Sequence, residues 1–154
     1  MLQPGDKAPD FKLLTTNGEL FQLSDKLREA SVVLYFYPKD ETRGCTAQAC
    51  SFRDQYEVFK EQGAEVVGIS SDKMDSHQKF TNKYNLPFIL LSDEGGKVRK
   101  AYDVPRTLGL IPGRVTYVID QQGIVRYAFN SLTKPLEHVE GALNCIKELQ
   151  QKKA

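Results

Sequence analysis

Two cysteines five residues apart, Cys45 and Cys50, are the side chains whose types and spacing best suit chemistry in this sequence. Cys45 comes at the start of a predicted helix that follows a predicted buried strand. The N-terminal end of a helix carries free N–H groups and a partial positive charge, which favour the thiolate, the nucleophilic form of cysteine. Gly44 leaves room for a substrate to approach the backbone amides, and Thr42 brings a hydroxyl group into the same region. The sequence therefore predicts a reactive thiolate at Cys45.

Helix geometry limits what Cys45 and Cys50 can do together. Five residues on an intact α-helix give a rise of about 7.5 Å and a rotation of about 140°. The two Cα atoms then lie roughly 8.6 Å apart, beyond the ~7 Å limit for a disulfide. Either no disulfide forms between them, or the first turns of the helix unwind when it does. At this point Cys50 is equally well interpreted as a resolving thiol or as a small core residue.

A metal site is the first alternative use of the cysteines. A structural zinc site needs about four Cys or His ligands, commonly arranged as closely spaced pairs. Cys145, His77 and His138 add no second pair at such spacing, so we disfavour a metal. We interpret His77 and His138 as solvated positions in polar helical stretches, and Cys145 as a packing residue of the C-terminal helix.

The composition gives no sign of a nucleic-acid or membrane partner. The 154 residues include 21 Lys+Arg and 20 Asp+Glu, for a formal net charge of +1, so no basic binding surface is predicted. The apolar run 32–37 is far shorter than the roughly 18–20 residues of a membrane helix. The odd cysteine count argues against a secreted disulfide framework, and no signal peptide is recognised at the first residues. We expect a cytoplasmic protein, or an organellar one if a transit peptide has been removed.

The apolar residues alternate between strand and helix periods along the chain, which predicts one α/β domain over residues 1–154. We expect a mixed central β-sheet flanked by helices, preceded by an N-terminal β-hairpin. Ligands on such sheets lie at the carboxyl ends of parallel strands, and the loop that leads to Cys45 is at such an end. Strands are predicted at 11–14, 20–23, 31–37, 65–70, 88–91, 115–119 and 124–129, and helices at 47–62, 75–84, 96–102 and 136–149.

The residues around Cys45 resemble a known family. Pro38, Thr42 and Cys45 form the pattern Pro-x-x-x-Thr-x-x-Cys, which is similar to the signature of the peroxiredoxins. A second cysteine five residues on, followed by an aromatic residue and Arg-Asp, is typical of the peroxiredoxin Q or bacterioferritin comigratory protein branch. The matching residues are Cys50, Phe52, Arg53 and Asp54, and similar blocks lie at 5–11, 91–95 and 112–120.

The resemblance implies a thioredoxin-like fold and a peroxidase that uses no metal, haem or flavin. Cys45 is then the peroxidatic cysteine, which attacks the peroxide to give a sulfenic acid. Cys50 is the resolving cysteine, which forms an intramolecular disulfide after local helix unwinding. Thr42 hydrogen-bonds the peroxide and the thiolate, Arg114 stabilises the thiolate and the transition-state charge, and Pro38 shields the nucleophile from water. The implied partners are hydrogen peroxide or an organic hydroperoxide and a thioredoxin-type reductant, and the implied oligomeric state is a monomer.

One residue departs from the pattern of the branch, which usually has Pro before the Gly-Cys pair where this chain has Arg43. Proline would stiffen the loop and suit the start of a helix. Arg43 instead adds a positive charge two residues from the nucleophile, which could favour the thiolate or contact a substrate or partner. The alternative, a solvent-facing side chain without a role, is favoured because surface charges contribute little.

Two other functions would use the same reactive thiolate at Cys45. A redox-sensing regulatory protein could use Cys45 and Cys50 to change a partner surface, and it need not turn over rapidly with excess peroxide and reductant. A protein disulfide oxidoreductase would normally carry Cys-x-x-Cys, which this sequence lacks.

Overall fold

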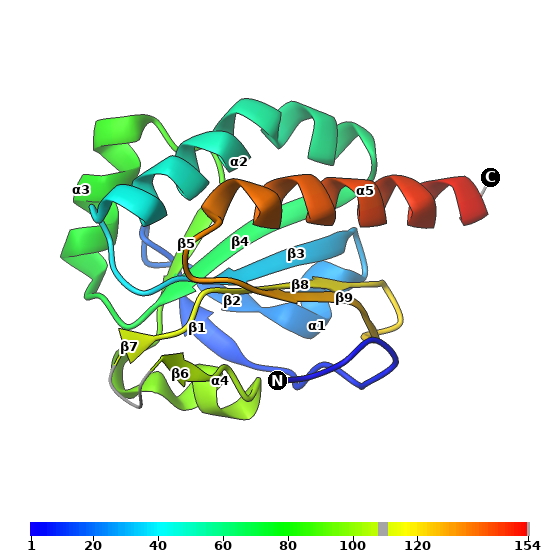
Figure 1. Ribbon diagram of the computed structural model, residues 1–154, viewed down its shortest axis with the longest axis horizontal. Helices are drawn as coiled ribbons and strands as arrows, with labels where there is room; N and C mark the ends of the chain where they lie inside the picture. Colours follow the sequence, from blue (N-terminus) through cyan, green and yellow to red (C-terminus); the bar gives the residue numbers. More distant parts are fainter. Residues whose placement is uncertain (108–110, 154) are drawn as a thin grey trace.

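The computed structural model describes residues 1–107 and 111–153, and its centre is a five-stranded mixed β-sheet (Figure 1). The middle strand β3 (Ser31–Phe36) pairs in parallel with β4 (Ala64–Ser70), which pairs in parallel with β5 (Ile89–Ser92). On its other side β3 pairs antiparallel with β8 (Val115–Ile119), and β8 pairs antiparallel with β9 (Val125–Asn130). The carboxyl ends of β3, β4 and β5 therefore meet the beginning of β8 at one edge of the sheet.

Three helices cover one face of this sheet: α2 (Arg43–Glu61), α3 (Met74–Tyr84) and α5 (Pro135–Lys153). In Figure 1, α2 and α5 lie side by side above the strands. Their apolar side chains form one core cluster with Val33 and Tyr35 of β3. Other buried members of this cluster are Ala49, Phe52, Phe59, Phe80, Val139 and Ile146.

The opposite face is covered by α1 (Leu23–Leu27), α4 (Lys97–Ala101) and the hairpin of β1 (Lys12–Leu14) and β2 (Leu20–Gln22). Successive side chains of a strand point to opposite faces of its sheet. The remaining apolar residues of β3 therefore enter a second core cluster on this side. Its buried members include Phe21, Leu23, Leu27, Val32, Leu34, Phe36, Val98 and Tyr102.

The predicted strands and long helices are confirmed, with ends that differ by a few residues. The helix predicted from residue 47 begins at Arg43. The sequence did not reveal this first turn, because Cys45 is its only core residue and a single residue shows no apolar period. The elements that the sequence analysis missed are two to five residues long, too short to show a period. They are α1, the 3-10 helix η1 (Glu94–Gly96), and the paired strands β6 (Arg106–Thr107) and β7 (Ile111–Pro112).

Tyr35 of β3 lies opposite Gly68 of β4, where there is no room for a side chain. A Cβ atom built on Gly68 would lie 2.8 Å from Tyr35 Cζ and 2.8 Å from Leu90 Cδ2. The Tyr35 hydroxyl is buried and has no hydrogen-bond partner among the described residues. The absence of a side chain at Gly68 therefore leaves room for the Tyr35 ring. This ring stacks on Phe52 of α2 with ring centroids 4.6 Å apart.

Replacement of Gly68 by alanine is expected to overpack this site. We predict that Gly68→Ala lowers the free energy of unfolding by roughly 1–3 kcal/mol, because Tyr35 and Leu90 have to shift. The double variant Tyr35→Phe/Gly68→Ala should recover part of this loss, since the removed hydroxyl is crowded and makes no hydrogen bond. Urea unfolding at neutral pH measures both effects, and an unchanged midpoint for Gly68→Ala would contradict the prediction.

Candidate active site

The nucleophile predicted from the sequence lies in the first turn of α2. Thr42 precedes the helix with an extended backbone conformation, and the first bond of the helix runs from Thr46 N–H to the Thr42 carbonyl at 2.8 Å. The backbone N–H groups of Arg43, Gly44 and Cys45 come before this bond, so they belong to the free positive end of the helix. The Cys45 side chain is 1% exposed and packs in the core cluster beneath α2.

Arg114 brings a positive charge to the same turn. Its position just before β8 places it near the carboxyl end of β3, because Val115 pairs with Phe36. The guanidinium is buried, and its Nη2 atom would lie 2.9 Å from a Cβ atom on Gly44. A Cβ atom at position 44 would therefore push the end of the guanidinium away from the turn that carries Cys45.

Two hydrogen bonds fix the orientation of the Arg114 guanidinium. Its Nη1 atom donates to Oε1 of Gln48 at 2.6 Å, and its Nε atom donates to the carbonyl of Leu132 at 3.2 Å. Gln48 belongs to the second turn of α2, and Leu132 belongs to the loop between β9 and α5. The side chain thus connects three segments that are far apart in the sequence.

Thr42 and Pro38 lie in the loop between β3 and α2, as the sequence predicted. The Thr42 hydroxyl is exposed and donates to the carbonyl of Lys39 at 3.0 Å. Its oxygen lone pairs stay available to accept a hydrogen bond from a bound substrate. Pro38 is half-buried at the end of β3. The structure therefore brings Pro38, Thr42, Cys45 and Arg114 to one edge of the sheet.

Cys50 lies on the same intact helix as Cys45, and both are free thiols. Cys50 is half-buried, unlike the fully buried Cys45. The helix spacing predicted from the sequence therefore applies, with the two Cα atoms too far apart for a disulfide in this conformation. The residues that follow are firmly held, because Phe52 stacks on Tyr35 and Arg53 Nη1 donates to the Tyr84 carbonyl at 2.7 Å.

The sequence analysis missed Gln48, which lies three residues after Cys45 on the same face of α2. Its side chain is completely buried, and its Nε2 atom has no hydrogen-bond partner among the described residues. Its spacing from Cys45 was a usable signal, because residues three apart on a helix are neighbours on its surface. A buried amide beside a nucleophile is otherwise hard to distinguish by sequence from an exposed one.

The interpretation of both histidines as solvated is wrong. His77 and His138 are fully buried, each with both ring nitrogens in hydrogen bonds. His138 Nε2 donates to the Ser131 carbonyl at 2.7 Å, and its Nδ1 accepts from the Thr116 hydroxyl at 2.8 Å. A single polar residue on an otherwise apolar helix face leaves the hydrophobic period intact, which is why the period did not reveal their burial.

Two residues left open by the sequence have ordinary surroundings. Burial raises the pKa of the half-buried Cys145 thiol to about 11, so it stays protonated at neutral pH, as the packing interpretation requires. Arg43 is exposed and makes no ion pair within residues 1–107 and 111–153. This arrangement agrees with a solvent-facing side chain.

Known proteins are similar to this chain in both sequence and fold. Residues 4–128 match the model of the AhpC/TSA family. This chain belongs to the AhpC/TSA family. It is 52% identical over 146 residues to the chloroplastic peroxiredoxin Q of Oryza sativa subsp. japonica, which covers 94% of this chain and 67% of the rice protein.

Solved structures agree with this assignment. The fold is similar to that of peroxidoxin BcpB from Mycobacterium tuberculosis, with a TM-score of 0.90 and 35% identity over 97% of this chain and 99% of that one. It is also similar to the Xanthomonas campestris bacterioferritin comigratory protein, with a TM-score of 0.83 and 28% identity over 91% and 92% of the two chains. Alkyl peroxide reduction is the activity described for that protein. This chain accordingly has a thioredoxin-like fold and is a thiol-dependent peroxidase of the peroxiredoxin Q branch.

None of the described helices is long and apolar enough to cross a membrane.

Gln48 is expected to matter through its bond to Arg114. We predict that Gln48→Leu slows peroxide reduction about tenfold, because the Arg114 guanidinium loses the acceptor that orients it in a buried site. Gln48→Glu keeps an acceptor at the same position and should retain more activity than Gln48→Leu. Second-order rate constants with hydrogen peroxide test this, and a parent-like rate for Gln48→Leu would count against the role of this bond.

His138 is expected to make stability depend on pH. Burial lowers the pKa of His138 to about 4, against 6.5 for a free histidine. As the pH falls from about 6.5 to about 4, His138 becomes protonated in the unfolded chain but stays neutral in the folded protein, so the folded state loses stability. Between about pH 7.5 and pH 4.5 this loss amounts to about 2–3 kcal/mol.

His138→Gln provides the test, because a glutamine side chain can donate to Ser131 and accept from Thr116 without titrating. Urea unfolding of the parent and of His138→Gln at both pH values gives the difference. The parent should lose about 2–3 kcal/mol more than the variant on acidification. Equal losses in the two proteins would show that His138 is not the group responsible.

Proposed function

We propose that Cys45 is the peroxidatic cysteine of this thiol-dependent peroxidase, assisted by Thr42, Arg114 and Pro38. The observation that carries this assignment is the position of the Arg114 guanidinium against Gly44, beside the free N–H groups of the first turn of α2. A thiolate at Cys45 thus faces a fixed positive charge and a helix N-terminus. Pro38 borders the site and limits the access of water to the thiolate.

The proposed first step is an in-line displacement at the peroxide. The Cys45 sulfur forms a bond to one peroxide oxygen with its electron pair, and the O–O bond breaks. Sulfur is oxidised to a sulfenic acid, and the departing oxygen takes up a proton to leave as water or an alcohol. Arg114 and the backbone N–H groups stabilise the negative charge that develops, and one fixed donor of this kind typically contributes on the order of 3 kcal/mol. The Thr42 hydroxyl accepts a hydrogen bond from the peroxide.

The proposed second step uses Cys50 as the resolving cysteine. Its sulfur attacks the sulfenic sulfur, an intramolecular disulfide forms and the hydroxyl group leaves as water. Because the intact helix keeps the two thiols apart, the turns of α2 from Arg43 to Cys50 must unwind first. The contacts of Phe52 and Arg53 hold the rest of the helix in place during this change.

A thioredoxin-type reductant is the partner that the family implies, and it returns the disulfide to two thiols while its own dithiol is oxidised. We propose that the protein acts as a monomer formed by a single thioredoxin-like domain over residues 1–154, without nucleic acid or a membrane as partner. We place the protein in the cytoplasm, or in an organelle, since the rice relative is a chloroplastic protein.

Three variants test the two-cysteine cycle. Peroxide consumption with a thioredoxin reducing system should be absent in Cys45→Ser, because the nucleophile is missing. Cys50→Ser should react once and then stall or over-oxidise, whereas Cys145→Ser should behave as the parent. Far-UV circular dichroism adds a structural readout: peroxide should lower the helical signal of the parent reversibly and leave that of Cys50→Ser unchanged.

Two outcomes would change the assignment. Turnover of Cys50→Ser at the parent rate would move resolution to Cys145 or to an external thiol. Peroxide consumption by Cys45→Ser would show that Cys45 is not the nucleophile.

A further inference from the structure

The loop from Pro38 to Thr42 depends on restraints from outside itself. Between its buried residue Asp40 and Thr42, Glu41 has a φ of 61°, in the left-handed region that side chains with a Cβ atom rarely adopt. Glu41 is exposed, and its carboxylate pairs with Lys83 at the surface at 3.0 Å. Exposed pairs of this kind contribute little. The hydrogen bond from Thr42 to the Lys39 carbonyl lies within the loop, so Asp40 is the residue that connects the loop to the interior of the protein.

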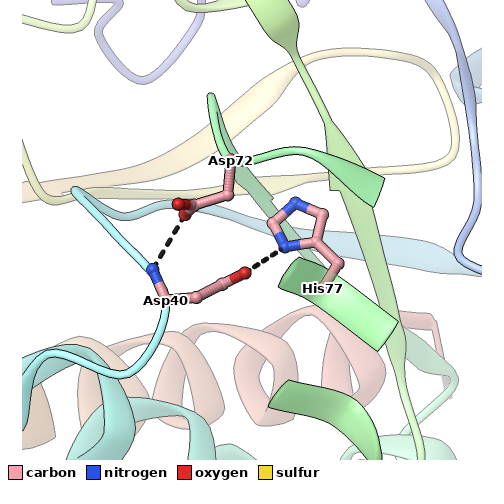
Figure 2. A group of neighbouring side chains, drawn as sticks. All are labelled: Asp40, Asp72 and His77. Carbon is pink, nitrogen blue, oxygen red and sulfur yellow. Dashed lines mark hydrogen bonds and ion pairs between the residues drawn. The ribbon is translucent and has the colours of Figure 1, made fainter. Parts of the chain in front are cut away.

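The Asp40 carboxylate is buried and fully engaged. Its Oδ1 accepts from the Tyr37 hydroxyl at 2.6 Å, and its Oδ2 accepts from the Ser76 hydroxyl at 2.9 Å. The same Oδ2 lies 2.6 Å from Nδ1 of His77 on α3 (Figure 2). Burial raises the pKa of Tyr37 well above its ordinary value, so its hydroxyl remains a donor to Asp40 at neutral pH.

The backbone of Asp40 is held as well. Its N–H donates to Oδ2 of Asp72 at 2.8 Å, and the same oxygen accepts from the Ser70 hydroxyl at 2.6 Å (Figure 2). The Asp72 carbonyl accepts from the hydroxyl of Ser92 at the end of β5. Asp40 is thereby fastened to α3 and to the ends of β4 and β5, which are the rigid elements around the active site.

Asp40, Asp72 and His77 form a hydrogen-bonded anchor for the loop from Pro38 to Thr42 (Figure 2). The Leu91 carbonyl, 3.0 Å from His77 Nε2, can only accept, so Nε2 carries a hydrogen. One proton then lies between His77 Nδ1 and Asp40 Oδ2.

We propose that Asp40 is a positioning residue of the peroxidase, which fixes Thr42 and the first turn of α2 by anchoring their loop to His77, Tyr37 and Asp72. The inference rests on the proposed roles of Cys45 and Thr42. The hydrogen bonds of the Asp40 carboxylate go to Tyr37, Ser76 and His77 and not to Cys45. Its effect on the reaction passes through Thr42, two residues later, and through the direction in which α2 begins. Misplacement of such groups by about 1 Å is enough to slow a reaction about a hundredfold.

The geometry of the anchor predicts a rescue. An asparagine at position 40 can still accept from Tyr37 through its carbonyl oxygen. Its amide can donate to His77 Nδ1, because a neutral ring with its hydrogen on Nε2 has a free lone pair there. An alanine at position 40 offers none of these bonds. Asp40→Ala removes both the charge and the side-chain hydrogen bonds, whereas Asp40→Asn removes the charge and keeps the bonds to Tyr37 and His77. Comparison of the two variants therefore separates the effect of the hydrogen bonds from the effect of the charge.

The test measures the second-order rate constant for hydrogen peroxide, the pH dependence of Cys45 alkylation by iodoacetamide, and the urea midpoint. Asp40→Ala should react with peroxide at least about tenfold more slowly than the parent. Asp40→Asn should recover to within about threefold of the parent, as the retained hydrogen bonds require. The control is Glu41→Gln, which changes the neighbouring exposed carboxylate of the same loop and should leave the rate unchanged. Cys45→Ser is measured in parallel, so that a failure of the proposed nucleophile is seen separately.

Three results would overturn the proposal. A rate for Asp40→Ala within twofold of the parent would show that the anchor does not position the site. Equal losses in Asp40→Ala and Asp40→Asn would show that the charge, not the hydrogen-bonded placement, is what matters. Should Asp40→Ala fail to fold, Tyr37→Phe decides, because it deletes one bond to Asp40 and leaves the ring in the core. Slower peroxide reduction by Tyr37→Phe at an unchanged urea midpoint supports the proposal, and a parent-like rate refutes it.

Discussion

The hydrogen bond from Arg114 to Gln48 is the contact on which the site depends. It joins the beginning of β8 to the second turn of α2, and it is buried from solvent. In this environment a hydrogen bond to a charged group contributes more than a neutral one, and the loss of either partner leaves a buried polar group unsatisfied. In the proposed cycle the same bond breaks when α2 unwinds between Arg43 and Cys50. The site therefore combines a well-ordered reduced form with a restraint that a single local change can release.

The fold could be predicted from the sequence to a large extent because its elements are long and periodic. Residues 32–36 are a continuous apolar run, Ala64–Ser70 is rich in apolar residues, and both segments are buried internal strands of the sheet. The reactive segment could also be located, since Cys45, Gly44 and Thr42 have distinctive types and spacing. The long-range partner Arg114 came from the family resemblance, because no local pattern connects a residue before β8 with the start of α2.

The polar residues inside the protein could not be predicted from the sequence alone. Gln48, His77 and His138 each look like surface residues of a helix, yet all three are buried. The burial of the two histidines is possible because partners from distant segments satisfy them, Asp40 for His77 and Thr116 for His138. A hydrophobic period records which face of a helix is apolar, and it carries no information about such partners.

The alternation of side chains along β3 has a consequence for the protein as a whole. Val32, Leu34 and Phe36 belong to one hydrophobic layer, whereas Val33 and Tyr35 belong to the other, which contains the buried apolar residues of α2. The central sheet therefore separates the layer that packs against α2 from the layer that packs against α1 and α4. Loss of order in the first turns of α2 perturbs the layer beneath that helix, while the layer beneath α1 and α4 keeps its packing. Local opening can require less free energy than global unfolding, so the unwinding of α2 in the proposed cycle is compatible with a protein that stays folded.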